Sequence, residues 1–96
     1  MNTESVWLLM VEDLRRGEGS TSCKEVYASY ELAEQALRRY VLGVVRRGGA
    51  DFCYDFVTSE YANIFYKTAV HDKYIMGVWV TRRLLRTALS TRSRRT

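Results

Sequence analysis

The sequence predicts a single α+β domain, an antiparallel sheet of about four or five strands with one principal helix packed on one face. Three observations predict this class. Several short segments are apolar on alternate residues or throughout, one long segment carries a helical apolar stripe, and glycine-rich or polar turns separate them. A chain of 96 residues is the size of one domain.

The first strand is predicted over residues 5–12, Ser-Val-Trp-Leu-Leu-Met-Val-Glu. Its side chains are apolar on both faces, which is typical of a central strand that is covered on two sides. The polar segment 15–22 contains two glycines and three hydroxyl residues, so we expect it to close a hairpin. The second strand of this hairpin is then residues 23–28.

The principal helix is predicted over residues 30–47. Ser29 is a good N-cap, acidic residues occupy the first turns and two arginines the last, and Gly48-Gly49 ends the pattern. One face is apolar at helical spacing: Ala33, Ala36, Leu37, Tyr40, Val41 and Val44.

The sequence of residues 50–60 is compatible with a strand, a loop or a helix. Phe52, Tyr54 and Phe56 alternate with Asp51, Cys53 and Asp55, which favours a short, half-exposed strand.

The C-terminal half is predicted to form a second hairpin, with strands over 62–70 and 74–81 and a turn at 71–73. Residues 82–90 suit a short helix with Leu84, Leu85 and Leu89 on its apolar side. The domain is therefore expected to span residues 1–90, with a basic C-terminal tail at 91–96.

The number of apolar faces predicts an oligomer. Two strands are apolar on both sides, but one long helix covers only one face of a sheet. The other face needs either the 82–90 segment or a second subunit, and we expect a homodimer. A monomer at tens of micromolar, measured by size-exclusion chromatography with light scattering, would contradict this expectation.

Charge is distributed unevenly along the chain. Residues 1–81 contain nine basic and eleven acidic residues, so their net charge is −2. The remaining segment adds six positive charges and no negative ones, which gives the net charge of +4. These six residues are Arg82, Arg83, Arg86, Arg92, Arg94 and Arg95. A compact body with a basic end is more typical of a binding protein than of an enzyme.

Two kinds of partner fit this layout. Glu12, Asp13 and Glu18 cluster near the first hairpin, and an acidic hairpin can dock onto a basic groove of another protein. The preferred prediction is therefore a small non-enzymatic accessory protein that acts by protein–protein docking. The alternative is a nucleic-acid-binding accessory protein whose six C-terminal arginines contact phosphates. No nucleic-acid-binding motif accompanies them.

A small enzyme is the second alternative. Cys53, His71 and either Asp51 or Asp72 form the one nucleophile, base and orienting set that a chain with a single histidine offers. On a strand with alternating aromatics, however, a cysteine is usually a small buried apolar side chain. No catalytic residue is predicted.

No cofactor or metal is expected. The segment 17–24 has glycines, hydroxyls and a lysine, but its spacing is not that of a phosphate-binding loop, and a strand follows where a helix is required. The two cysteines, Cys23 and Cys53, match neither a disulfide framework nor a zinc pattern.

The N-terminus shows no signal peptide, and no apolar run is long enough to cross a membrane. The sequence therefore predicts a cytoplasmic protein with no membrane partner.

One junction resembles a known group of proteins. The segment 26–37, Val-Tyr-Ala-Ser-Tyr-Glu-Leu-Ala-Glu-Gln-Ala-Leu, follows an apolar strand and a glycine-rich hairpin. This layout is similar to small uncharacterised proteins of bacteriophages and large DNA viruses. The resemblance covers about the first 45 residues and implies a fold class and a viral setting, with a location in the cytoplasm or nucleus of a host cell. It implies no functional residues, because the matching positions are a strand end, an N-cap and a helix stripe.

Overall fold

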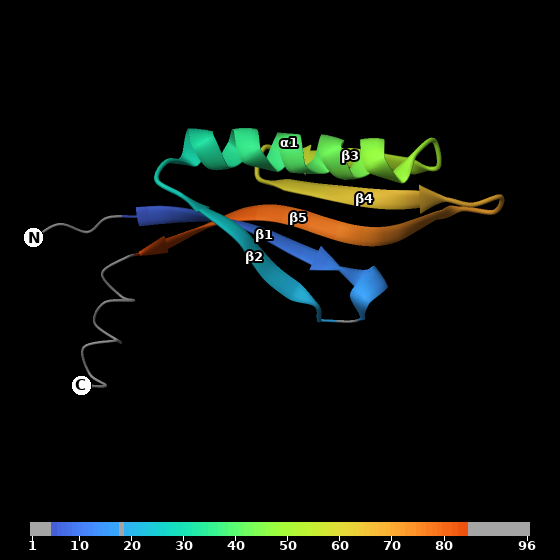
Figure 1. The fold of residues 1–96 in the computed structure, drawn as a ribbon, viewed down its shortest axis with the longest axis horizontal. Helices are drawn as coiled ribbons and strands as arrows, with labels where there is room; N and C mark the ends of the chain where they lie inside the picture. Colours follow the sequence, from blue (N-terminus) through green and yellow to red (C-terminus); the bar gives the residue numbers. More distant parts are fainter. Residues whose placement is uncertain (1–4, 18, 85–96) are drawn as a thin grey trace, which may run out of the picture.

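The computed structural model describes residues 5–17 and 19–84. It confirms the predicted α+β class, with one five-stranded antiparallel sheet in the order β2-β1-β5-β4-β3 and one main helix along one face (Figure 1). The elements are β1 (Ser5–Asp13), η1 (Leu14–Arg16), β2 (Thr21–Tyr27), α1 (Tyr30–Gly48), β3 (Phe52–Thr58), β4 (Tyr61–Lys67) and β5 (Asp72–Leu84).

Helix α1 begins and ends where the sequence predicts. The Ser29 side chain accepts a hydrogen bond from the Leu32 amide at 3.2 Å, a cap that contributes about 1 kcal/mol to helix stability. At the other end Gly49 has φ 89°, a left-handed value that favours glycine. Its amide donates to the Val45 carbonyl at 3.2 Å and so closes the last turn.

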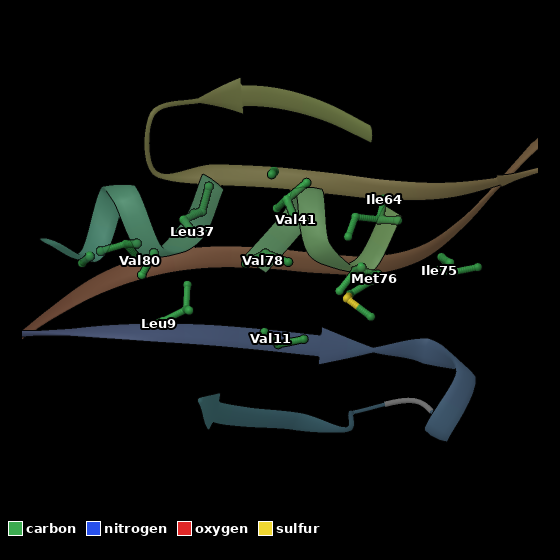
Figure 2. Close-up of a cluster of buried hydrophobic side chains, with 13 residues drawn as sticks. Leu9, Val11, Leu37, Val41, Ile64, Ile75, Met76, Val78 and Val80 are labelled. Atoms are coloured by element: carbon green, nitrogen blue, oxygen red, sulfur yellow. The ribbon is translucent and has the colours of Figure 1, made fainter. Parts of the chain in front are cut away.

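The core lies between α1 and the central strands. Helix residues such as Leu37 and Val41 pack on the alternate side chains of β1, β4 and β5, including Leu9, Ile64 and Val78 (Figure 2). All of the helix stripe is buried except Tyr40, which is half-buried. The predicted stripe is therefore the face that holds the helix to the sheet.

The first hairpin contains two irregularities. A register shift leaves Lys24 as an extra residue in β2, because Leu9 pairs with Glu25 while Met10 pairs with Cys23. After β1 the chain forms the short 3-10 turn η1, which the sequence did not predict. The Asp13 carboxylate caps this turn by accepting from the Arg15 amide at 3.0 Å.

The segment that the sequence left open is the edge strand β3. It pairs only with β4, and Tyr54 and Phe56 stand opposite Ile64 and Ala62 on the helix side. Both aromatic side chains are more than a third exposed.

The second hairpin turns earlier than predicted. Strand β4 ends at Lys67 rather than residue 70, because the Thr68 hydroxyl accepts the amides of Val70 and His71 and forms the turn there. Asp72 and Lys73, predicted as turn residues, are already paired in β5.

The helix predicted over 82–90 is wrong at its start. Arg82, Arg83 and Leu84 continue strand β5 and pair with Trp7, Val6 and Ser5 of β1. Pairing with a central strand has overridden a local sequence that favours helix. Residues 85–90 and the tail at 91–96 lie outside the described part of the chain.

Candidate interaction surface

The sheet has one face that no described helix covers, here called the helix-free face. Its position follows from strand alternation, since Leu9 and Val11 point toward the helix and Leu8 and Met10 therefore point away. Leu8 pairs with Val26 of β2, which is 54% exposed. The helix-free face carries an aliphatic strip, formed by Val6, Leu8, Met10 and Val26.

Beside this strip lies an aromatic group, formed by Tyr61, Phe65, Tyr74 and Trp79 on β4 and β5. Trp79 lies between the two sets, because it pairs with Met10 on one side and with Tyr61 on the other. The rings contact each other in pairs, with Trp79 stacked on Tyr61 at 6.4 Å between centroids and Phe65 edge-on to Tyr74 at 6.0 Å.

Gly77 makes room for this aromatic group. The Tyr74 hydroxyl occupies the space where a Cβ at position 77 would lie. Burial, together with the neighbouring Tyr61 hydroxyl and the charge of Glu12, raises the pKa of Tyr74 to about 12. The Tyr74 phenol is thus held neutral within an apolar surface.

The raised pKa of Tyr74 makes a prediction for alkaline pH. The folded protein binds this proton more tightly than the unfolded chain, whose tyrosine has a pKa of 10.0. The stability that comes from binding the Tyr74 proton more tightly in the folded state is therefore complete below pH 10 and is lost as the pH rises toward about 12. Phenolate absorbance should show one tyrosine that ionises near pH 12, and Tyr74→Phe should remove it.

Two results separate this prediction from its alternatives. Tyr61→Phe should lower the pKa of Tyr74 without restoring its ordinary value, because burial is the larger cause. Complete ionisation of all seven tyrosines well below pH 12, with the circular dichroism spectrum still native, would contradict the burial of Tyr74.

The structure places two of the three predicted acidic residues, Glu12 and Asp13, on opposite faces of the sheet. Glu12 pairs with Gly77 and belongs to the helix-free face, where its charge acts on Tyr74. Asp13 points to the helix side and forms a two-point ion pair with Arg15, at 3.0 Å to Nε and 2.9 Å to Nη2. This contact lowers the pKa of Asp13. Glu18 lies outside the described residues.

The predicted arginines are described only in part. Arg82 and Arg83 are exposed at the end of β5, and as neighbours in a strand they point to opposite faces. Arg83 pairs with Val6 and lies on the helix-free face. Arg86, Arg92, Arg94 and Arg95 lie outside the described residues.

The residues considered for nucleophilic catalysis are far apart in the sheet. Cys53 pairs with Phe65, whereas His71 lies in the turn that follows Lys67. Along β4, three residue steps separate Phe65 from the start of this turn at Thr68, so Cys53 and His71 are about 10 Å apart or more. Among residues 5–17 and 19–84, no three side chains of His, Cys, Asp or Glu are grouped to hold a metal ion.

Sequence reasoning predicted an uncovered apolar face but not the grouping of its aromatic residues. Tyr61, Phe65, Tyr74 and Trp79 are spread over 19 positions and share a face only because a register shift after Ile64 brings Tyr74 opposite Phe65. Strict two-residue alternation along β5 would place Tyr74 and Trp79, five residues apart, on opposite faces of the sheet.

No family model matches the chain, and no curated protein or solved structure is significantly similar to it. No described helix is long and apolar enough to cross a membrane. The function is therefore inferred from the geometry of the chain itself.

Proposed function

We propose that the protein is a small non-enzymatic binding protein, which acts by protein–protein docking through the helix-free face. One observation carries this proposal. The aliphatic strip and the aromatic group adjoin at Trp79 on one face of β2, β1, β5 and β4, and no described element covers them. Large uncovered apolar patches on small domains mark interaction sites, and tyrosine and tryptophan are enriched there.

The occupant that the charges favour is a second copy of the chain. Glu12 lies opposite Gly77 and Arg83 opposite Val6, so they stand near the two ends of the aliphatic strip on adjacent strands. A two-fold axis in the plane of the interface, perpendicular to the strands, exchanges these ends. It places Glu12 of each copy beside the partner's Arg83 when the sheets pack about 10 Å apart.

Charge reversal tests this arrangement. Either Glu12→Arg or Arg83→Glu alone should weaken self-association several-fold, because each places two pairs of like charges in the interface. The double variant should restore most of the lost affinity, since it exchanges the two charges and keeps their pairing. Sedimentation equilibrium of the three variants and the wild-type protein measures the dissociation constants.

The matched control is Arg82→Glu, which changes the neighbouring residue on the helix side of the sheet. It should leave self-association within about twofold, because screened charges far from an interface contribute little. Additive losses in the Glu12 and Arg83 double variant, with no restoration, would contradict the proposed axis.

Nucleic acid is a less favoured occupant. On the helix-free face the sheet places three carboxylates, Glu12, Asp55 and Asp72, and two cations, Lys67 and Arg83. A phosphate backbone needs an excess of positive charge. The helix-free face therefore supports protein docking better than base stacking. From the sequence we propose a cytoplasmic location, which the resemblance at 26–37 extends to the cytoplasm or nucleus of a host cell.

A further inference from the structure

A second site lies on the other side of the sheet, between the first hairpin and the C-terminal half of α1. It is a pocket of about 270 Å³, here called the basic pocket. Its floor is apolar and buried, formed by Val11, Val44 and Met76. Phe52 and the half-buried Tyr40 form one wall, and the hydroxyl residues Ser20 and Ser22 lie opposite in the hairpin.

The rim of the basic pocket is strongly cationic. Among the described residues, four basic side chains line it, Arg15, Arg16, Lys24 and Arg47, together with one acidic side chain, Asp13. Arg15 is already paired with Asp13 and lies over the Phe52 ring, 5.9 Å from its centroid. Among the residues that the structure describes, the other three cations form no ion pair with a carboxylate.

Separate elements place these cations around one space. Arg16 comes from the 3-10 turn, and Lys24 is the extra residue of the bulge in β2. Arg47 lies one turn beyond Gly43 on α1, and its guanidinium folds back beside that glycine. A Cβ added at Gly43 would stand 3.2 Å from Nη1 of Arg47. Burial raises the pKa of Tyr40, and the charges of Asp13, Arg47, Arg15 and Arg16 also act on its hydroxyl.

We propose that the basic pocket binds the phosphate monoester of a small organic molecule. Arg16, Lys24 and Arg47, which pair with no described carboxylate, fit a tetrahedral dianion better than a planar monoanion, since each can reach one of its three free oxygens. The Ser22 hydroxyl can donate a further hydrogen bond, whereas the Ser20 hydroxyl already donates to the Arg16 carbonyl at 3.3 Å. The apolar floor and Phe52 then contact the organic part. The volume of the basic pocket is just below about 300 Å³, the lower end of the range for small-molecule sites, which favours a compact metabolite.

Adenosine monophosphate, inorganic phosphate and adenosine are suitable probes, titrated by isothermal calorimetry against the full chain at low salt. We expect the monophosphate to bind most tightly, inorganic phosphate more weakly and adenosine not at all. Arg47→Gln should weaken monophosphate binding at least about tenfold, through loss of one charge-assisted hydrogen bond. Lys24→Gln, on a different element, should give a similar loss.

The matched control is Arg46→Gln, which removes the adjacent charge from the same helix turn but not from the pocket. It should change the affinity less than about twofold. Absence of phosphate binding in the wild-type protein would overturn the proposal, as would equal losses in the Arg46 and Arg47 variants. Equal affinity for inorganic phosphate and the monophosphate would overturn the assignment to an ester. The pocket lies on the helix side, so these outcomes do not depend on docking through the helix-free face.

Discussion

Leu37→Ala is expected to lower the free energy of unfolding by about 3 to 5 kcal/mol, the range for a leucine removed from a rigid core. Leu37 is fully buried at the centre of the helix stripe and belongs to the core that α1 forms with β1, β5 and β4 (Figure 2). A domain of this size is typically stable by only about 5 to 15 kcal/mol, so the variant should be close to unfolding at 37 °C. Urea denaturation followed by circular dichroism measures the change.

Leu42→Ala on the same helix is the control. Leu42 is 43% exposed on the outer side of α1, and its loss should cost less than about 1 kcal/mol. Both variants are compared at one protein concentration, because self-association would add concentration-dependent stability. Equal losses at positions 37 and 42 would show that the predicted stripe is not the face that binds the sheet.

Trp79→Ala is expected to weaken self-association by about thirtyfold or more. Trp79 stands at the junction of the aliphatic strip and the aromatic group, and buried tryptophans at the centre of an interface are typical hot spots worth about 2 kcal/mol or more. The substitution also removes the stacked contact with Tyr61, so a modest loss of stability is expected in the monomer. Sedimentation equilibrium gives the dissociation constant, and circular dichroism verifies the fold.

Tyr54→Ala is the control for Trp79. Tyr54 is 44% exposed, but it lies on edge strand β3 opposite Ile64 and therefore faces the helix side. Its loss should change the dissociation constant less than about threefold, because it lies outside the proposed interface. A Trp79→Ala variant that is folded and associates like the wild-type protein would place the interface elsewhere.

The sequence predicts the elements whose signals are local. The Ser29 cap, the stripe through Leu37 and the glycine pair after residue 47 give the helix almost to the residue. Where tertiary pairing competes with local preference, the prediction is less accurate. Residues 82–84 suit a helix in isolation, but in the folded protein they pair with Trp7, Val6 and Ser5 of β1.

The candidate sites depend on contacts that no local pattern records. The helix-free face can be predicted by comparing the apolar faces of the strands with the single long helix, yet the aromatic group depends on one register shift in β4 and β5. The basic pocket depends on the bulge at Lys24 and on a 3-10 turn that pairs Asp13 with Arg15. Glu12 and Asp13 read as one acidic cluster in the sequence, but strand alternation places them on opposite faces.

The molar mass of the wild-type protein in solution tests the central claim most directly. Size-exclusion chromatography with light scattering at tens of micromolar should give twice the chain mass of 11.2 kDa. The mass should fall toward that of one chain on dilution and in the Trp79→Ala variant. A folded wild-type protein with the mass of a single chain at tens of micromolar would contradict docking of a second copy on the helix-free face.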